Sequence, residues 1–192
     1  MDTPEVVERL RSLANPAALD GMSRYGITVD RALGVSMPKL RALAKGLGKN
    51  HELALSLWDT GIHDARILAS LVDAPAAVTE EQMERWVQAF DSWDVCDQCV
   101  MNLFARVSCA ERKAHEWSVR PEEYVKRAGF VVMARLASSD RKAPDSVFLR
   151  LQKGKPTTLT VPARYAAGTA SGKEHDYRGV TGDAAQTGQA FA

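Results

Sequence analysis

The sequence lacks the features that mark membrane and secreted proteins. No apolar run approaches the roughly 18 residues needed to cross a bilayer, and the first residues carry no basic stretch followed by an apolar core. Only three of the 192 residues are cysteine, which is typical of a reducing compartment. These absences predict a cytoplasmic protein with no membrane partner.

The sequence also lacks the usual cofactor and nucleophile motifs. It has no glycine-rich phosphate loop, no Ser/His/Asp arrangement and no metal-ligand constellation. Cys96 and Cys99 form one C-x-x-C, which could indicate redox or zinc chemistry. There is no second such pair, and His115 has poor ligand spacing, so small buried apolar residues are the favoured interpretation. We therefore expect neither a metal nor an organic cofactor.

Charge gives no global indication of a partner. The formal net charge is +1, with 25 basic and 24 acidic residues. A nucleic-acid surface would have to come from a one-sided arrangement of basic residues, which composition does not reveal.

What the sequence does contain is a succession of amphipathic helical stripes with short polar joins and no alternating strand pattern. Thr3 is placed to cap the first helix, Ser36 the fourth, and Thr79 begins a capping box. The patterns predict an all-α protein with helices near residues 4–14, 18–25, 29–33, 36–47, 51–59, 63–73, 80–90, 92–107, 109–117, 121–137 and 144–151.

The spacing of these helices indicates a repeat architecture. A unit of roughly 35 to 45 residues predicts a solenoid of HEAT-like antiparallel helix pairs, an α-α superhelix, over residues 1–152. A compact bundle is the competing architecture. Residues 153–192 differ, since they hold six of the thirteen glycines and a single leucine. This low-complexity composition predicts a disordered or irregular tail.

One stretch near the middle, residues 90–99, stands out chemically. On a helix starting at about Ser92, Trp93 and Asp97 lie four residues apart on one face, and Asp94 is turned away. An indole beside a carboxylate suits a cationic ligand or a reaction that passes through a cation. The alternative is structural, because tryptophans on such helices usually lie in the core and aspartates often cap helices or face solvent.

Three segments resemble the AlkD-like family of DNA alkylation repair proteins: Leu33–Arg41, Ser92–Asp97 and Tyr124–Phe130. The resemblance covers about residues 3–150. It implies a curved stack of HEAT-like helix pairs that holds duplex DNA in a concave basic groove. The best-known members are DNA glycosylases that hydrolyse the bond to N3- and N7-alkylated purines without a base-flipping pocket.

The resemblance also implies roles for individual residues. Trp93 and Asp97 fall on the family's aromatic and acidic catalytic positions, and Arg127 falls on an arginine that supports the site and the DNA backbone. An interhelical salt bridge is the alternative role for Arg127. Further candidates for DNA binding lie near helix starts or joins, although most charges on helices only face solvent; these candidates are Lys39, Arg41, Arg66, Lys126, Arg141 and Lys142.

The chain departs from the family at its C-terminal end. The family carries a further tryptophan in a C-terminal helix, whereas this chain has none after Trp117. We hypothesise that a truncation or frameshift after Leu151 replaced the final helices. The expected function is a monomeric glycosylase acting on duplex DNA with alkylated purines. The alternatives are a non-catalytic helical-repeat module that binds DNA or protein, and a defective copy.

Overall fold

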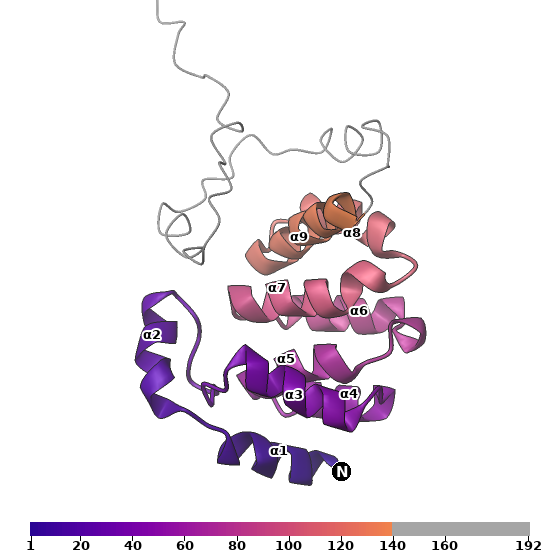
Figure 1. The fold of residues 1–192 in the computed structure, drawn as a ribbon. Helices are drawn as coiled ribbons and strands as arrows, with labels where there is room; N and C mark the ends of the chain where they lie inside the picture. Colours follow the sequence, from indigo (N-terminus) through magenta and orange to yellow (C-terminus); the bar gives the residue numbers. More distant parts are fainter. Residues whose placement is uncertain (140–192) are drawn as a thin grey trace, which may run out of the picture. The chain divides into compact units, whose positions relative to one another are not determined.

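The computed structural model describes residues 1–139 as a stack of helices (Figure 1). Within this range there is no strand, and three short 3-10 turns, η1 (Pro16–Ala18), η2 (Pro75–Ala77) and η3 (Phe104–Arg106), join some of the helices. The α-helices are α1 (Thr3–Ser12), α2 (Leu19–Arg24), α3 (Met37–Leu47), α4 (His51–Asp59), α5 (His63–Val72), α6 (Glu80–Gln88), α7 (Trp93–Asn102), α8 (Ala110–Ser118) and α9 (Glu123–Ser139).

Successive helix pairs form the layers of this stack. In Figure 1, α4 with α5, α6 with α7, and α8 with α9 lie one above another, and α1 lies at the lower end. Helix α5 packs against both α3 and α7, and α7 packs against α9, so these four helices form one continuous side, here called the inner row. Stacked antiparallel pairs confirm the all-α prediction and exclude a simple bundle.

The repeat is shorter than the predicted 35 to 45 residues. Helices α5, α7 and α9 begin 30 residues apart, at His63, Trp93 and Glu123. The predicted length was wrong because the helices from α3 to α8 are only 9 to 11 residues long and most of their joins are only a few residues long. One consequence is general for this fold: side chains about 30 residues apart in the sequence lie side by side in adjacent layers.

Several helix ends differ from those predicted. The N-cap of α1 is Asp2 rather than Thr3, because Asp2 and Glu5 form a reciprocal capping box. Residues 29–33 form no helix; Ala32 N donates to Val29 O in an isolated turn. Helix α7 ends at Asn102, before η3, rather than near Val107. Thr79 caps α6 as predicted, accepting a hydrogen bond from Gln82 N.

The core is rich in aromatic rings from different layers. Trp58 of α4 and Trp86 of α6 stack face to face, with ring centroids 4.0 Å apart and an interplanar angle of 3°. The ring centroid of Phe104 lies 6.3 Å from that of Trp86 and 5.7 Å from that of Trp117. The three tryptophans are buried, which confirms the core role predicted for them. Trp93 is thus distinct, as it is only partly buried.

Gly129 sets the spacing of the last described layer. A Cβ atom at this position in α9 would lie 2.6 Å from Ser118 N and 2.9 Å from Ala114 O, both in α8. No side chain larger than hydrogen fits without moving the backbone. The close contact between α8 and α9 therefore depends on this glycine, and it places the inner side of α9 against α7.

Some sequence predictions lie outside the described residues. These are the helix near 144–151, the tail from 153 to 192 with the domain boundary before it, and the basic residues Arg141 and Lys142. Within residues 1–139, no helix is long and apolar enough to cross a membrane.

Candidate functional site

The candidate site lies where α7 begins. Ser92 adopts the extended backbone of an N-cap, Trp93 is the first helical residue, and Asp97 follows one turn later. The spacing of four places the indole and the carboxylate on the same face, as predicted. Cys96, Cys99 and Val100 of the same helix are buried in the core. Trp93 and Asp97, by contrast, keep part of their surface accessible.

Asp97 forms a two-pronged ion pair with Arg127 of α9. Arg127 Nε donates to Asp97 Oδ1 and Nη2 donates to Oδ2, each at 2.7 Å. The side chains remain partly accessible, at 28% for Arg127 and 20% for Asp97. The two residues are 30 positions apart, which is one repeat. Arg127 thus forms the interhelical salt bridge that the sequence offered as the alternative to a phosphate contact.

Arg127 also lies over the indole of Trp93. Its guanidinium carbon is 5.7 Å from the ring centroid, within the range of a cation–π interaction. The three residues predicted as catalytic therefore meet in one constellation, here called the inner triad: Trp93, Asp97 and Arg127. A carboxylate, a guanidinium and an aromatic face together can contact a cation, an anion and a planar ring.

The N-terminal part of the chain reaches this constellation through main-chain and hydroxyl groups. Trp93 Nε1 donates to the carbonyl oxygen of Tyr25 at 3.0 Å, and Thr28 Oγ1 donates to Asp91 O at 2.9 Å. The Tyr25 side chain itself is 60% exposed. The indole is thereby fixed at its N–H edge, so that a ligand would contact the ring through a face rather than through the N–H.

Asp94, which the sequence set aside, connects α7 to α5. Its Oδ1 accepts from Ser92 Oγ at 2.5 Å and from Val95 N at 2.9 Å, and its Oδ2 lies 2.8 Å from His63 Nε2. Burial works against the ionised form, but these hydrogen bonds, His63 foremost, hold the pKa of Asp94 below its usual value. Asp94 is therefore a structural carboxylate, distinct from the accessible Asp97.

The predicted basic residues are distributed along the inner row. Lys39 and Arg41 are exposed on α3, and Lys126 is half-buried on α9. Arg66 of α5 is occupied within the protein, since it donates to Asp91 Oδ2 at 3.2 Å and lies 5.3 Å from the Trp58 ring centroid. Four of the six predicted residues thus lie in the described part of the chain, on α3, α5 and α9.

Cys96 and Cys99 have the structural role that the sequence favoured. Both are fully buried and free, and burial raises the pKa of each thiol. Thiols with raised pKa values are poor nucleophiles and poor ligands. Within residues 1–139, no three His, Cys, Asp or Glu side chains form a group that could hold a metal.

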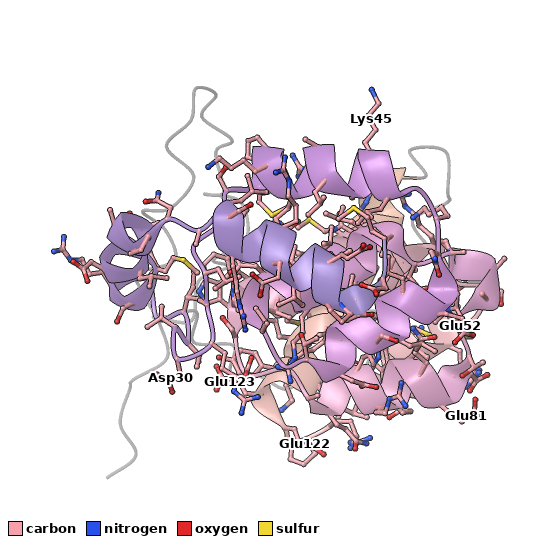
Figure 2. All side chains as sticks on the ribbon, turned by 90° about the horizontal axis from the view of Figure 1, so that it is seen from below. Asp30, Lys45, Glu52, Glu81, Glu122 and Glu123 are labelled. Atoms are coloured by element: carbon pink, nitrogen blue, oxygen red, sulfur yellow. The ribbon has the colours of Figure 1, made fainter. Side chains whose placement is uncertain are left out.

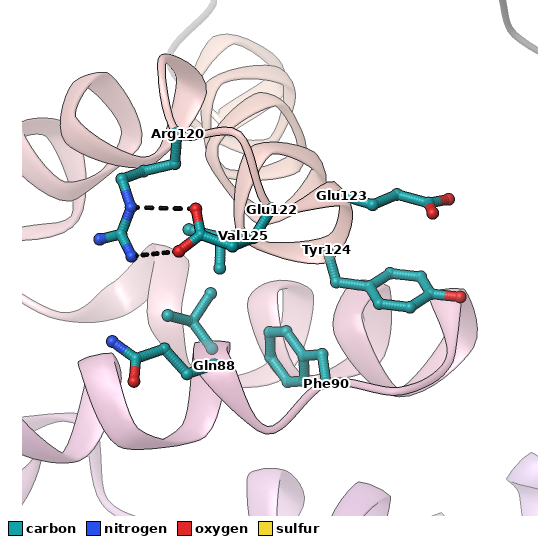
Figure 3. Close-up of a pocket in the computed structure, with 8 residues that line it drawn as sticks. Gln88, Phe90, Arg120, Glu122, Glu123, Tyr124 and Val125 are labelled. Carbon is teal, nitrogen blue, oxygen red and sulfur yellow. Dashed lines mark hydrogen bonds and ion pairs between the residues drawn. The ribbon is translucent and has the colours of Figure 1, made fainter.

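A shallow cleft of about 410 Å³ opens beside the start of α9 (Figure 3). Phe90 and Tyr124 line it, and the Arg120–Glu122 ion pair lies on one side of it. The lining contains none of the inner triad. With Glu122 and Glu123 at its rim, the cleft is acidic, which disfavours a phosphate ligand there.

Comparison with known proteins gives the chain its place. The model of a family described as DNA alkylation repair enzymes matches residues 6–153. The chain belongs to this family. The match extends from the first turns of α1 beyond the last described residue, so it includes the inner triad and every helix of the inner row.

Two relatives show how this member compares with others. An uncharacterized protein of Listeria innocua, Lin0241, is 26% identical over 158 residues, which is 82% of this chain and 65% of that protein. A solved structure described as a new family of proteins related to the HEAT-like repeat DNA glycosylases, with affinity for branched DNA structures, matches with a TM-score of 0.66. It is 23% identical, over 77% of this chain and 61% of that one. The chain thus spans less than two thirds of the length of either relative, and the second confirms the HEAT-like fold.

In this member of the DNA alkylation repair family, the sequence did not reveal the contacts between α7 and the segments packed against it. It did not anticipate His63, Asp64 or the Tyr25 carbonyl as partners of the site. A signal was present: His63 and Asp94 are 31 residues apart, as are Leu33 and Asp64. With the correct repeat length, that spacing would have paired them.

Proposed function

We propose that this chain acts in DNA repair as a glycosylase that hydrolyses the N-glycosidic bond of cationic N3- or N7-alkylated purines in duplex DNA. The observation that carries the proposal is the inner triad: a partly accessible carboxylate held by two hydrogen bonds, with an aromatic ring beside it. Membership in the DNA alkylation repair family supports the same assignment.

The chemistry of the lesion suits these groups. An alkylated purine already carries positive charge, so it leaves without a strong general acid. As the bond breaks, positive charge grows on the sugar, and an anionic group nearby stabilises it and can orient water. Asp97 fits this role. Each of its oxygens accepts one hydrogen bond from Arg127 and keeps a further lone pair for water.

Trp93 and Arg127 complete the proposed site. The indole face attracts a cationic base or sugar by about 1–2 kcal/mol when water is excluded. Arg127 offsets the repulsion between the Asp97 carboxylate and the phosphates, and it holds that carboxylate in place. Lys39, Arg41 and Lys126, on the same row of helices, fit the role of electrostatic contacts to the DNA backbone, which makes binding salt-dependent.

Release of the base from duplex DNA carrying N7-methylguanine tests the proposal. The chain should release the base at low salt, and Asp97→Asn should reduce the rate at least tenfold, on the order of 1.4 kcal/mol of transition-state stabilisation. Asp59→Asn, an exposed aspartate at the end of α4, is the control and should leave the rate unchanged. Absence of release by the parent chain would overturn the glycosylase assignment.

A second candidate is a non-catalytic module that binds branched DNA. It is favoured by the stated affinity of the structural neighbour for branched DNA. The Asp97–Arg127 ion pair also favours it, because both carboxylate oxygens already accept a hydrogen bond within the protein. Equilibrium binding to a four-way junction and to a linear duplex of equal length separates the two. Tighter binding to the junction, without base release from either substrate, would establish the second function in place of the first.

A further inference from the structure

His63 occupies a buried position behind the inner triad. It is the first residue of α5, and its side chain is only 7% exposed. No role was predicted for it from the sequence. Its Nε2 lies 2.8 Å from Asp94 Oδ2. Its Nδ1 lies 3.7 Å from Asp64 Oδ2, too far for a hydrogen bond but close enough for strong attraction between charges.

The two carboxylates beside His63 hold different parts of the chain. Asp94 accepts hydrogen bonds from Val95 N and Ser92 Oγ at the start of α7. Asp64 accepts from Leu33 N at 2.6 Å and from Val35 N at 2.7 Å, in the segment that precedes α3. His63 therefore lies between the start of α7 on one side and residues 25–35 on the other.

The same segment receives the indole of Trp93. His63 N donates to Arg31 O at 3.0 Å, and six residues earlier the Tyr25 carbonyl accepts the Trp93 N–H. The indole is thus held at both ends, by α7 through its backbone and by residues 25–35 through its N–H. Both supports converge on His63.

We infer that His63 is a positioning residue that fixes the indole of Trp93 by joining the start of α7 to residues 25–35. The imidazolium form attracts both carboxylates, whereas a neutral ring can donate to only one acceptor and leaves Asp64 and Asp94 facing each other across it. Proton loss from His63 loosens this joint and releases the orientation of Trp93.

The charged groups around the ring support the imidazolium form. Burial opposes it, but the negative charge of Asp64 and the hydrogen bond and charge of Asp94 outweigh burial and raise the pKa of His63 to about 9. Asp64 comes from α5 itself and Asp94 from α7. From residues 25–35, the Arg31 guanidinium runs alongside Gly61, just before α5. His63 is accordingly protonated near neutral pH, where it attracts both carboxylates. It loses its proton in alkaline solution, and that attraction with it.

Nuclear magnetic resonance of the intact chain tests this inference without DNA. The four indole N–H signals are assigned with Trp→Phe variants, and pH is raised stepwise while the His63 ring signal is followed. The Trp93 indole signal should titrate with the His63 midpoint, about 9, while the signals of Trp58, Trp86 and Trp117 stay fixed.

Two variants sharpen the result. Asp94→Asn should lower the His63 midpoint by about one unit or more, because it removes a charge partner. His63→Gln should abolish the alkaline titration of Trp93 and speed exchange of its indole proton, whereas His115→Gln on α8 should change neither. A Trp93 signal that ignores the His63 titration would overturn the inference, because His63 would then act on stability alone.

The link between this joint and base release rests on the proposed function. If the triad releases bases, His63→Gln should lower the release rate at neutral pH. The size of the loss should follow the increase in exchange rate of the Trp93 indole proton. The resonance experiment requires no activity, so failure of the glycosylase proposal and failure of the joint are distinguishable.

Discussion

Two clusters of charged residues occupy equivalent registers in this repeat protein, and they are built differently. The inner triad joins α7 to α9 by one arginine and one carboxylate beside a partly exposed Trp93. The outer cluster joins α6 to α8. There Lys113 is buried among Glu84, Glu116 and Glu80, and Trp117 Nε1 donates to Glu84 at 2.8 Å. Both use partners about 30 residues apart.

The difference lies in what each cluster leaves accessible. In the outer cluster Trp117 is fully buried and its N–H donates to the Glu84 carboxylate, so its ring is not accessible to a ligand. In the inner triad the tryptophan, carboxylate and guanidinium all retain accessible surface. Repeat spacing brings charged partners together in both places, but only the inner triad combines them with a partly accessible indole.

The largest expected contrast between the two regions is their response to pH. A group whose pKa is raised in the folded state stabilises the fold fully below its unfolded pKa, about 6.5 for His63, and loses that contribution as pH rises through about 9. The free energy of unfolding, measured with urea, should fall by ~3 kcal/mol across this window. Hydrogen-exchange protection, corrected for the intrinsic rise of the exchange rate with pH, should fall at the start of α7 and remain unchanged in α8.

The control for this contrast is His63→Gln, which should show no such fall. An equal fall in that variant would mean that another group dominates the alkaline response, and the inner region would then be no more pH-sensitive than the outer one.

Removing the central cation should affect the outer cluster more than the inner triad. Lys113→Met keeps the buried stem but leaves Glu84 and Glu116 without their shared partner, and we expect a loss of about 2 kcal/mol of unfolding free energy. Arg127→Met removes a cation that is 28% exposed, against 7% for Lys113, and should cost about 1 kcal/mol. Urea unfolding measures both.

Lys45→Met is the matched control, since Lys45 projects from α3 away from the stack (Figure 2). It should change stability by less than about 0.5 kcal/mol. A larger loss in Arg127→Met than in Lys113→Met would reverse the comparison, and would assign the inner triad a mainly structural role.

The contact between the two regions can be probed at Gly129. Gly129→Ala inserts a methyl group against the α8 backbone and should destabilise the protein by about 1–2 kcal/mol while displacing α9, which carries Arg127. Gly46→Ala is the control. Gly46 also lies in a helix, but a methyl group added there would meet nothing within 4 Å, so alanine should stabilise by about 0.5–1 kcal/mol. Thermal unfolding of both variants distinguishes packing from helix propensity.

Helical periodicity predicted most of this fold, because each helix buries a stripe that can be read locally. The bounds of α4 were predicted correctly, as was the Thr79 cap of α6. Residues 29–33 were not, because their local apolar pattern resembles a turn of helix while Asp64, 31 positions from Leu33, binds Leu33 N and Val35 N in a non-helical backbone. A distant carboxylate cannot be inferred from a local pattern.

The candidate site shows the same division. The spacing of four between Trp93 and Asp97 placed both on one face, and resemblance added Arg127. Neither spacing nor resemblance indicated that Arg127 Nε and Nη2 are both committed to Asp97, or that the Tyr25 carbonyl holds the indole. These contacts depend on how adjacent layers stack, and that in turn depends on the repeat length, which the sequence pattern overestimated.

The most direct test of the difference between the two clusters is base release by two isosteric variants measured side by side. Asp97→Asn and Glu84→Gln each convert a paired carboxylate to an amide, one in the inner triad and one in the outer cluster. With duplex DNA containing N7-methylguanine, we predict roughly a tenfold or greater loss of release for Asp97→Asn. For Glu84→Gln, we predict no loss of base release once the rate is corrected for the fraction of the protein that is folded. Equal rates for the two variants would contradict the assignment of the inner triad as the functional site.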